Sequence, residues 1–146
     1  MSELELPIAR VLESYKSAVL ARDVDGFMRL YDPKVRVFDT WGVWEYEDSA
    51  RWRRAIEAWF NSLGTEKVKV TFDDVQTSGS REFAVVSATV TFAGVSAQGE
   101  QLRSMQNRLT WALRTSGHML RIFHEHTSAP VGFEDAKAIL QRKSEP

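Results

Sequence analysis

Hydrophobic residues near the start of the chain recur every three or four positions, the spacing of one face of a helix. This pattern covers residues 3 to 22 and predicts a long amphipathic helix with one apolar stripe facing a core. The stripe consists of Leu4, Ile8, Val11, Leu12, Tyr15, Ala18 and Val19.

Two further helices are predicted from their start and stop signals. Asp23 is a suitable N-cap for a short helix that runs through Leu30, and Pro33 ends it. Ser49 is a suitable N-cap for a third helix, and Gly64 stands where a glycine often ends one. The apolar positions of this third helix are Trp52, Ile56, Trp59, Phe60 and Leu63.

The rest of the chain alternates with the period of β-strands. TSGH at residues 115 to 118 predicts a tight hairpin, and apolar positions at 133 to 140 suggest a short terminal helix. Helices followed by an antiparallel meander indicate an α+β fold, with the helices laid on one face of a curved sheet. We therefore expect a single domain over residues 1 to 146. The predicted strands cover residues 35–39, 67–72, 82–93, 102–114 and 119–127.

Apolar residues occur on both faces of the predicted strands, whereas a sheet with one solvated face would have them on one face only. Residues 83 to 92 are apolar or small on both parities. Leu109 and Trp111 lie on one side of their strand, with Arg108 and Thr110 on the other. We expect helices to cover one face and a second copy of the chain to cover the other, which makes a homodimer.

Composition narrows the function classes. Apolar residues make up 43% of the 146 residues, charged residues make up 27%, and the net charge is −1, with no run of like charges that would predict a nucleic-acid partner. The absence of cysteine excludes disulfides, thiolate catalysis and cysteine-ligated zinc. No apolar stretch approaches the roughly 20 residues of a membrane span. The N-terminal segment lacks the features of a secretory signal, so a cytoplasmic location is expected.

One acidic residue stands where the alternation predicts an inward side chain. Val35, Val37 and Asp39 share one side of their strand, and Trp41 follows at the same parity. Tyr15 lies on the apolar stripe of the first helix, so its hydroxyl also points toward the sheet. A desolvated carboxylate is a better base, and a nearby O–H can stabilise an oxyanion. In the alternative interpretation Asp39 caps a turn into Trp41, and Tyr15 hydrogen-bonds to backbone.

Three stretches together resemble a known family. They are Y-x-x-A-x-x-x-x-D-x-x-x-x-x-x-L-Y-D-P-x-V-x-V-F-D at residues 15–39, W-x-x-A-I-E-x-W-F at 52–60, and I-F-H-E-H-T-S-A-P at 122–130. The chain resembles, over nearly its whole length, the SnoaL-like and ketosteroid-isomerase-like branch of the nuclear transport factor two-like superfamily. The resemblance implies a cone-shaped, curved antiparallel sheet wrapped by three N-terminal helices, with a pocket inside the cone.

The resemblance also implies roles for residues. Asp39 matches the aspartate that shuttles the proton in ketosteroid isomerases, and Tyr15 matches the tyrosine that stabilises the enolate. The third acid of those enzymes has no match in the region of Thr110, where Thr110 or Arg108 could act as the donor instead. The HEHTSAP ending is also similar to the association domain of calcium/calmodulin-dependent kinases, which is an assembly module.

The closing strand carries the remaining candidates. By resemblance, Phe123, Glu125 and Thr127 face the cone, which turns His124 and His126 outward. Two histidines without a third ligand do not predict a metal site. Glu125 is expected opposite Arg108 on the neighbouring strand, either as an ion pair that holds the strand register or as part of the ligand site.

Two functions are compatible with these residues. The first is a cofactor-independent isomerase, cyclase or dehydratase that uses Asp39 and Tyr15 on a carbonyl substrate. The second is a non-catalytic module of the same fold that binds a small hydrophobic or amphipathic molecule or supports assembly. In either case the predicted pocket is lined by Trp41, Trp52, Trp59, Arg108, Thr110, Glu125 and Thr127.

Overall fold

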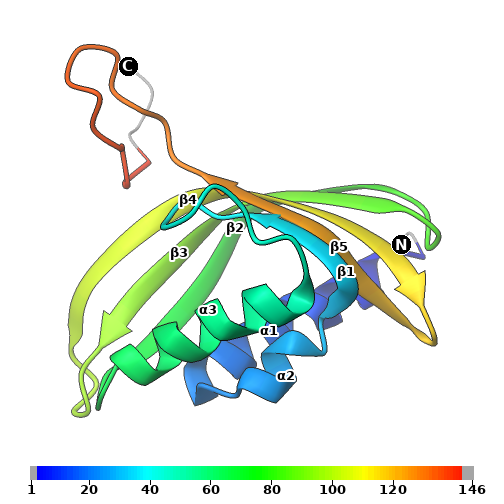
Figure 1. Cartoon of the computed structure of the whole chain (residues 1–146), viewed down its shortest axis with the longest axis horizontal. Coiled ribbons are helices and arrows are strands. Elements are labelled where there is room, and N and C mark those ends of the chain that lie inside the picture. The colour runs from blue at the N-terminus through cyan, green and yellow to red at the C-terminus, as the bar shows by residue number, and fades with distance from the viewer. Residues whose placement is uncertain (1–2, 143–146) are drawn as a thin grey trace.

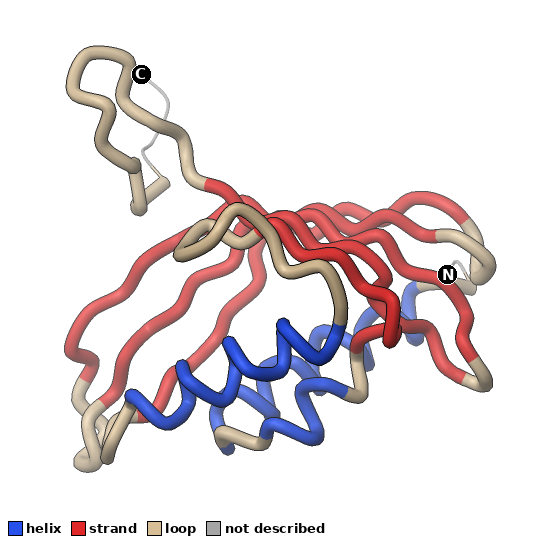
Figure 2. The backbone as a smooth tube through the Cα atoms, viewed as in Figure 1, coloured by secondary structure: helices blue, strands red, loops and turns tan. Residues whose placement is uncertain are grey.

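The architecture consists of three helices laid against one face of a five-stranded sheet. The computed structural model describes residues 3–142. Figures 1 and 2 show that the sheet is strongly curved and that all three helices lie on its concave side. The elements are α1 (Glu5–Ala21), α2 (Val24–Met28), β1 (Tyr31–Phe38), α3 (Ser49–Ser62), β2 (Lys67–Gly79), β3 (Ala84–Val95), β4 (Gln101–Ser116) and β5 (Met119–Ser128).

The sheet has the strand order β1-β5-β4-β3-β2. Strands β2 to β5 form the predicted antiparallel meander, whereas β1 pairs with β5 in parallel, so the complete sheet is mixed. Because α3 and the long connection before it separate β1 from β2, β1 is free to pair with the last strand instead of the next one. The α+β cone predicted from the sequence is thereby confirmed.

The helices form where the apolar spacing and the caps place them. The buried residues of α1 are Ile8, Val11, Tyr15, Ala18 and Val19, which belong to the predicted stripe. The side chain of Asp23 caps α2 by accepting a 3.0 Å hydrogen bond from the Gly26 N–H. At α3 the cap is Asp48, not Ser49, because the Asp48 carboxylate accepts from the Arg51 N–H at 2.9 Å.

The core lies between the helices and the concave sheet face and is rich in aromatic rings. The Tyr15 ring lies 5.0 Å from that of Phe27, 5.5 Å from that of Phe72 and 5.7 Å from that of Trp111, measured between centroids. Trp111 is fully buried. These tilted and edge-on contacts are the arrangements that aromatic pairs prefer, and they hold α1 at a fixed height above the sheet.

The predicted C-terminal helix is wrong. Residues 129–142 form an irregular arm that extends away from the body in Figure 1. Phe133, within this arm, is fully exposed. Strand β5 ends at Ser128, opposite Arg108, which leaves the earlier part of β4 without that neighbour. The returning arm fills this edge, since the Gln106 N–H donates to the Leu140 carbonyl at 2.7 Å.

A β-bulge changes one further prediction. Ala112 pairs with His124 and Leu113 with Ile122, so Phe123 has no partner on β4. Ile122 is fully buried, and Phe123 lies outside the core against Phe83. Phe123 therefore does not face the interior of the cone, because the extra residue reverses the side-chain alternation at that point.

No helix within residues 3–142 is long and apolar enough to cross a membrane.

Candidate functional site

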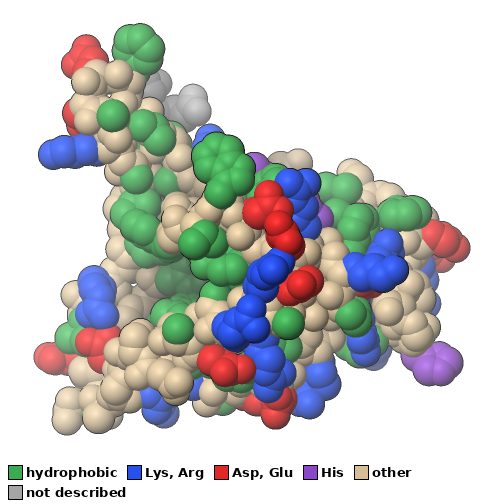
Figure 3. Space-filling view, in the orientation of Figure 1, with side chains coloured by type: hydrophobic (Ala, Val, Ile, Leu, Met, Phe, Trp, Pro, Cys, Tyr) green, Lys and Arg blue, Asp and Glu red, His purple; other side chains and the backbone are tan. Residues whose placement is uncertain are grey.

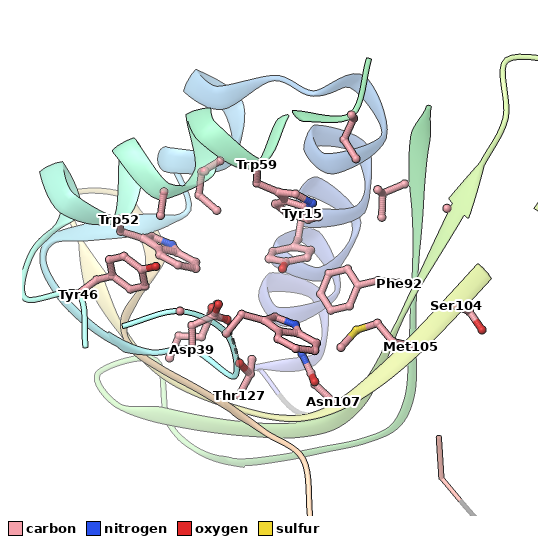
Figure 4. A pocket seen from close by; sticks show the side chains of 18 of the residues that line it. Tyr15, Asp39, Tyr46, Trp52, Trp59, Phe92, Ser104, Met105, Asn107 and Thr127 are labelled. Carbon is pink, nitrogen blue, oxygen red and sulfur yellow. Dashed lines mark hydrogen bonds between the residues drawn. The ribbon is translucent and has the colours of Figure 1, made fainter. Parts of the chain in front are cut away.

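A cavity of about 570 Å³ lies between α1, α3 and the concave face of the sheet. Its size is in the range of pockets that enclose small organic ligands. In Figure 3 apolar side chains gather around a hollow in this side of the molecule. Figure 4 shows Trp52 and Trp59 extending from α3 and Tyr15 from α1 toward the sheet, where Asp39, Thr127 and Asn107 lie.

Asp39 lines this cavity because β1 alternates up to its end. Val35 and Val37 are fully buried, and Asp39 continues the same side one residue after the strand. The Thr127 hydroxyl donates to the Asp39 carboxylate at 3.1 Å, and the Thr40 N–H donates to the Thr127 hydroxyl at 2.9 Å. Burial raises the pKa of Asp39, and the hydrogen bonds to its carboxylate partly offset this. The site thus contains a fixed carboxylate with increased basicity.

Tyr15 opens into the same cavity from the helix layer. Burial raises the pKa of Tyr15 well above its usual value, and the charges of Glu125 and Asp39 raise it further, so the phenol keeps its proton. Within residues 3–142 its hydroxyl makes no hydrogen bond, although its ring is packed on three sides. A neutral O–H held in this way is a suitable donor to an oxygen of a bound molecule.

Glu125 is the second carboxyl group of the cavity. It is 2% exposed, and its Oε1 accepts from the Tyr31 hydroxyl at 2.6 Å and from the Trp111 indole N–H at 2.8 Å. Burial raises the pKa of Glu125 to about 7; the two donors lower it, and the charge of Asp39 raises it further. Near neutral pH the cavity therefore contains a carboxyl group that is often protonated beside one that is a base.

The expected neighbour of Glu125 lies on the other side of the sheet. Arg108 and Thr110 are exposed and line a separate groove on the convex face, where the Arg108 guanidinium donates to the Ser128 hydroxyl at 3.1 Å. The predicted ion pair of Arg108 with Glu125 is therefore wrong, and neither Arg108 nor Thr110 lines the pocket. Alternation along β4 turns Asn107, Leu109 and Trp111 inward, so the residues between them point outward.

The three predicted tryptophans all line the cavity. Trp52 is buried on α3, and the ring of Trp59, two turns further along the same face of the helix, packs 5.9 Å from that of Phe92. Trp41 is 52% exposed and belongs to the loop between β1 and α3. These rings and the neighbouring aliphatic residues form cavity walls that suit a flat, mostly apolar molecule.

Sequence reasoning missed several polar residues of the cavity, above all Asn107. Its side chain is 5% exposed, and its Oδ1 has no hydrogen-bond partner within residues 3–142. Arg103 lies on the same side of β4 and pairs with Glu66 at 2.5 Å. The signal was present in the alternation of β4, which places Arg103, Met105 and Asn107 on the side of the buried Leu109.

The two histidines of the closing strand face away from the cavity. His124 Nδ1 lies 2.7 Å from the Arg36 carbonyl oxygen, and both imidazoles pack edge-on against Phe38, with centroids 5.0 and 5.4 Å away. In the part of the chain that the structure describes, no three side chains from histidine, cysteine, aspartate and glutamate are grouped in a way that could hold a metal ion.

Comparison with known proteins identifies the fold and the family. The profile of the SnoaL-like domain matches residues 8–132. The structure is similar to an NTF2-like protein of unknown function from Pseudomonas putida, with 21% identity, a TM-score of 0.81 and coverage of 97% of this chain and 96% of that one. Comparison with curated proteins found no match.

Two further solved structures share the fold. Aln2 from a Streptomyces species is 15% identical, with a TM-score of 0.79 and coverage of 88% of this chain and 91% of that one. An NTF2-like protein from Cytophaga hutchinsonii is 14% identical, with a TM-score of 0.67 and coverage of 89% and 100%. At these identities the likeness concerns the fold alone.

Proposed function

Because the chain belongs to the SnoaL-like domain family, whose fold is that of ligand-binding or isomerase-type domains, we propose that it is an enzyme that moves a proton next to a carbonyl group. Its substrate would be a small ring ketone, and the outcome an isomerisation, cyclisation or dehydration. The proposal depends on one observation above all. The Asp39 carboxylate and the Tyr15 hydroxyl open into the same aromatic-lined cavity.

The chemistry follows from these two groups. The Asp39 carboxylate takes a proton from the carbon beside the carbonyl, and the electron pair of that C–H bond forms the C=C bond of an enolate. The Tyr15 O–H donates a hydrogen bond to the enolate oxygen, where the negative charge collects. In an isomerisation a second C=C bond extends the enolate, and Asp39 returns the proton to the far carbon of that system. In a dehydration Asp39 gives the proton to the hydroxyl on the next carbon, which leaves as water. In a cyclisation the enolate carbon attacks a second carbonyl carbon of the substrate, whose oxygen takes up the proton. Enolisation needs only a base and a hydrogen-bond donor, so no cofactor is required by the proposal.

The other polar groups support Asp39. Thr127 holds the Asp39 carboxylate in place through its 3.1 Å hydrogen bond. Glu125 lies in the same cavity, and its negative charge raises the pKa of Tyr15. When Glu125 is protonated, Asp39 is the principal negative charge near the bound substrate.

The alternative is a pocket of the same fold that binds a small molecule without turnover. In that case Asp39 is a structural residue, and its replacement would mainly lower stability. The raised pKa of Asp39 favours the enzyme, because a purely structural carboxylate gains nothing from desolvation of its charged form.

The two functions are separated by following hydrogen–deuterium exchange at the carbon beside the carbonyl of 1-tetralone, a flat bicyclic ketone, by NMR in D₂O. We expect the wild-type protein to accelerate the exchange above the buffer rate. Asp39→Asn should lower the catalysed rate by about 10²- to 10⁴-fold, the usual contribution of a positioned base. Its thermal midpoint should stay the same or rise, because the substitution removes a charge that burial disfavours.

Asp73→Asn provides the matched control, since Asp73 is an exposed aspartate on β2. It should leave the exchange rate unchanged. Binding of 1-tetralone with no catalysed exchange in the wild type would favour the non-catalytic pocket, and unchanged exchange in Asp39→Asn would refute the role of Asp39.

We also propose that a second copy of the chain covers the convex face of the sheet. Thr110 on β4 and Val85 on β3 are exposed on this face, and Val85 is an apolar side chain with half of its surface accessible. A small or apolar sheet surface of this kind suits a symmetric contact. The cytoplasmic location stays a prediction from the sequence.

A further inference from the structure

The wall of the cavity contains a polar side chain that the proposed proton transfer does not use. Three buried side-chain polar atoms lack a hydrogen-bond partner within residues 3–142, namely Trp52 Nε1, Asn107 Oδ1 and Arg121 Nε. The first two belong to residues that line the cavity, one on α3 and one on β4. Buried polar groups in proteins nearly always find partners, so a buried amide without any partner in the wall of a cavity points to a partner that the chain itself does not supply. The Asn107 Oδ1 lies too deep to meet a bound molecule, and the amide nitrogen, which is absent from this set of deeply buried atoms, is the end that a ligand can reach.

Asn107 is the clearer of the two. The Trp52 N–H lies close enough to the Tyr31 hydroxyl to influence its pKa, although no hydrogen bond forms between them. Asn107 makes no side-chain hydrogen bond within the described residues. An apolar residue would fill its position without the cost of burying an amide, as Leu109 does two residues further along the same face of β4.

Asn107 and Asp39 line separate parts of the cavity wall. Strand β5 separates β4 from β1, so the two backbones are about 10 Å apart across the sheet. Along the strands, Leu109 pairs with Thr127, the partner of Asp39, and Asn107 lies two residues beyond that level. A ligand that reaches both residues must therefore carry polar atoms at two separate points of its skeleton.

We propose that Asn107 determines substrate specificity by hydrogen-bonding a hydroxyl group at the end of the ring system remote from the reacting carbonyl. The substrate class is then a flat hydroxy-ketone, such as a phenolic bicyclic or polycyclic ketone, and not a plain hydrocarbon ketone. A hydroxyl suits this position because its oxygen can accept from the amide N–H₂ of Asn107, the end of the amide that keeps accessible surface. The proposal uses the cavity assigned above but does not depend on turnover.

The test compares two ketones that differ by one hydroxyl, 1-tetralone and 6-hydroxy-1-tetralone. Dissociation constants are measured from the quenching of tryptophan fluorescence for the wild-type protein, Asn107→Leu and the control Met105→Leu, which changes an apolar residue of the same wall. We expect the wild type to prefer the hydroxylated ketone by roughly tenfold, in line with the usual contribution of one buried hydrogen bond. Asn107→Leu should lose this preference and keep its affinity for 1-tetralone, and Met105→Leu should retain the preference.

The stability of the same variants distinguishes a ligand-binding amide from a structural one. Asn107→Leu should melt at or above the wild-type temperature, because it removes an amide without a partner, and Asn107→Ala serves in its place if the leucine variant does not fold. Equal affinities of the wild type for the two ketones would overturn the proposal, and so would an unchanged preference in the Asn107 variants or the absence of saturable binding of both ketones at millimolar concentration. A preserved preference without catalysed exchange would instead refute only the proton transfer.

Discussion

Substituting glutamine for Glu125 keeps the shape of the side chain and removes its titration, which isolates the effect of this carboxyl group on stability. The amide oxygen of glutamine can still accept from the Tyr31 hydroxyl and the Trp111 N–H, which donate to the same Glu125 oxygen in the wild type. The substitution changes how the stability of the protein depends on pH. The experiment therefore measures how strongly the cavity disfavours a negative charge at this position.

The pKa of Glu125 determines the sign and the size of the change in unfolding free energy with pH. It is raised from 4.5 to about 7 by burial. Below pH 4.5 the carboxyl group is protonated in both folded and unfolded chains and has no effect on their balance. Between 4.5 and 7 the unfolded chain loses this proton while the folded chain keeps it, so the free energy of unfolding falls as pH rises. The difference of about 2.5 pKa units corresponds to about 3 kcal/mol, which is fully lost above about pH 8.

The assay is urea denaturation followed by tryptophan fluorescence at several pH values between about 4.5 and 8.5. The quantity of interest is the wild-type unfolding free energy minus that of Glu125→Gln, because this difference cancels the titrating groups that do not interact with Glu125. It should fall by about 3 kcal/mol across the range. Glu100→Gln, at an exposed loop position, should follow the wild type at every pH. A difference between wild type and Glu125→Gln that stays constant with pH would show that Glu125 has an ordinary pKa in the folded protein and that burial does not disfavour its charge.

Two other substitutions test the remaining parts of the site and the surface. Tyr15→Phe removes only the hydroxyl, so the catalysed exchange of 1-tetralone should fall by about 10²- to 10³-fold while the thermal midpoint changes little. An unchanged rate would exclude Tyr15 as the oxyanion donor. Thr110→Arg places a charge on the convex face, so light scattering should show a dimer for the wild type and a monomer for the variant. The variant should keep its exchange activity. A monomeric wild type at micromolar concentration would rule out this interface.

Local patterns in the sequence were sufficient for the elements and for one side of the site. The 3.6-residue period of the first helix placed Tyr15 inward, and the alternation through Val35 and Val37 placed Asp39 in the cavity. These predictions depend only on the geometry of single elements, which the order of residues determines directly. The family resemblance added the cone shape, which the structure confirms.

The predictions that went wrong depended on contacts between distant segments. The partners of Glu125 could not be inferred, because the Tyr31 hydroxyl that it binds lies 94 residues earlier in the chain. Arg108 was assigned to the pocket for its charge, against the alternation that turned it outward. The bulge at Phe123 and the irregular arm at the C-terminus follow from strand pairing, which a hydrophobic pattern alone does not determine.

The parallel pairing of the first and last strands determines when the proposed site forms during folding. The hydrogen bond from Thr127 to Asp39 joins residues 88 positions apart, so Asp39 is held in the cavity only after the whole meander has folded back onto β1. Such long-range contacts close late because the connecting chain must first lose its freedom. In a nascent or partly unfolded chain Asp39 would be an ordinary hydrated carboxylate, so the proposed proton transfer requires the completed fold.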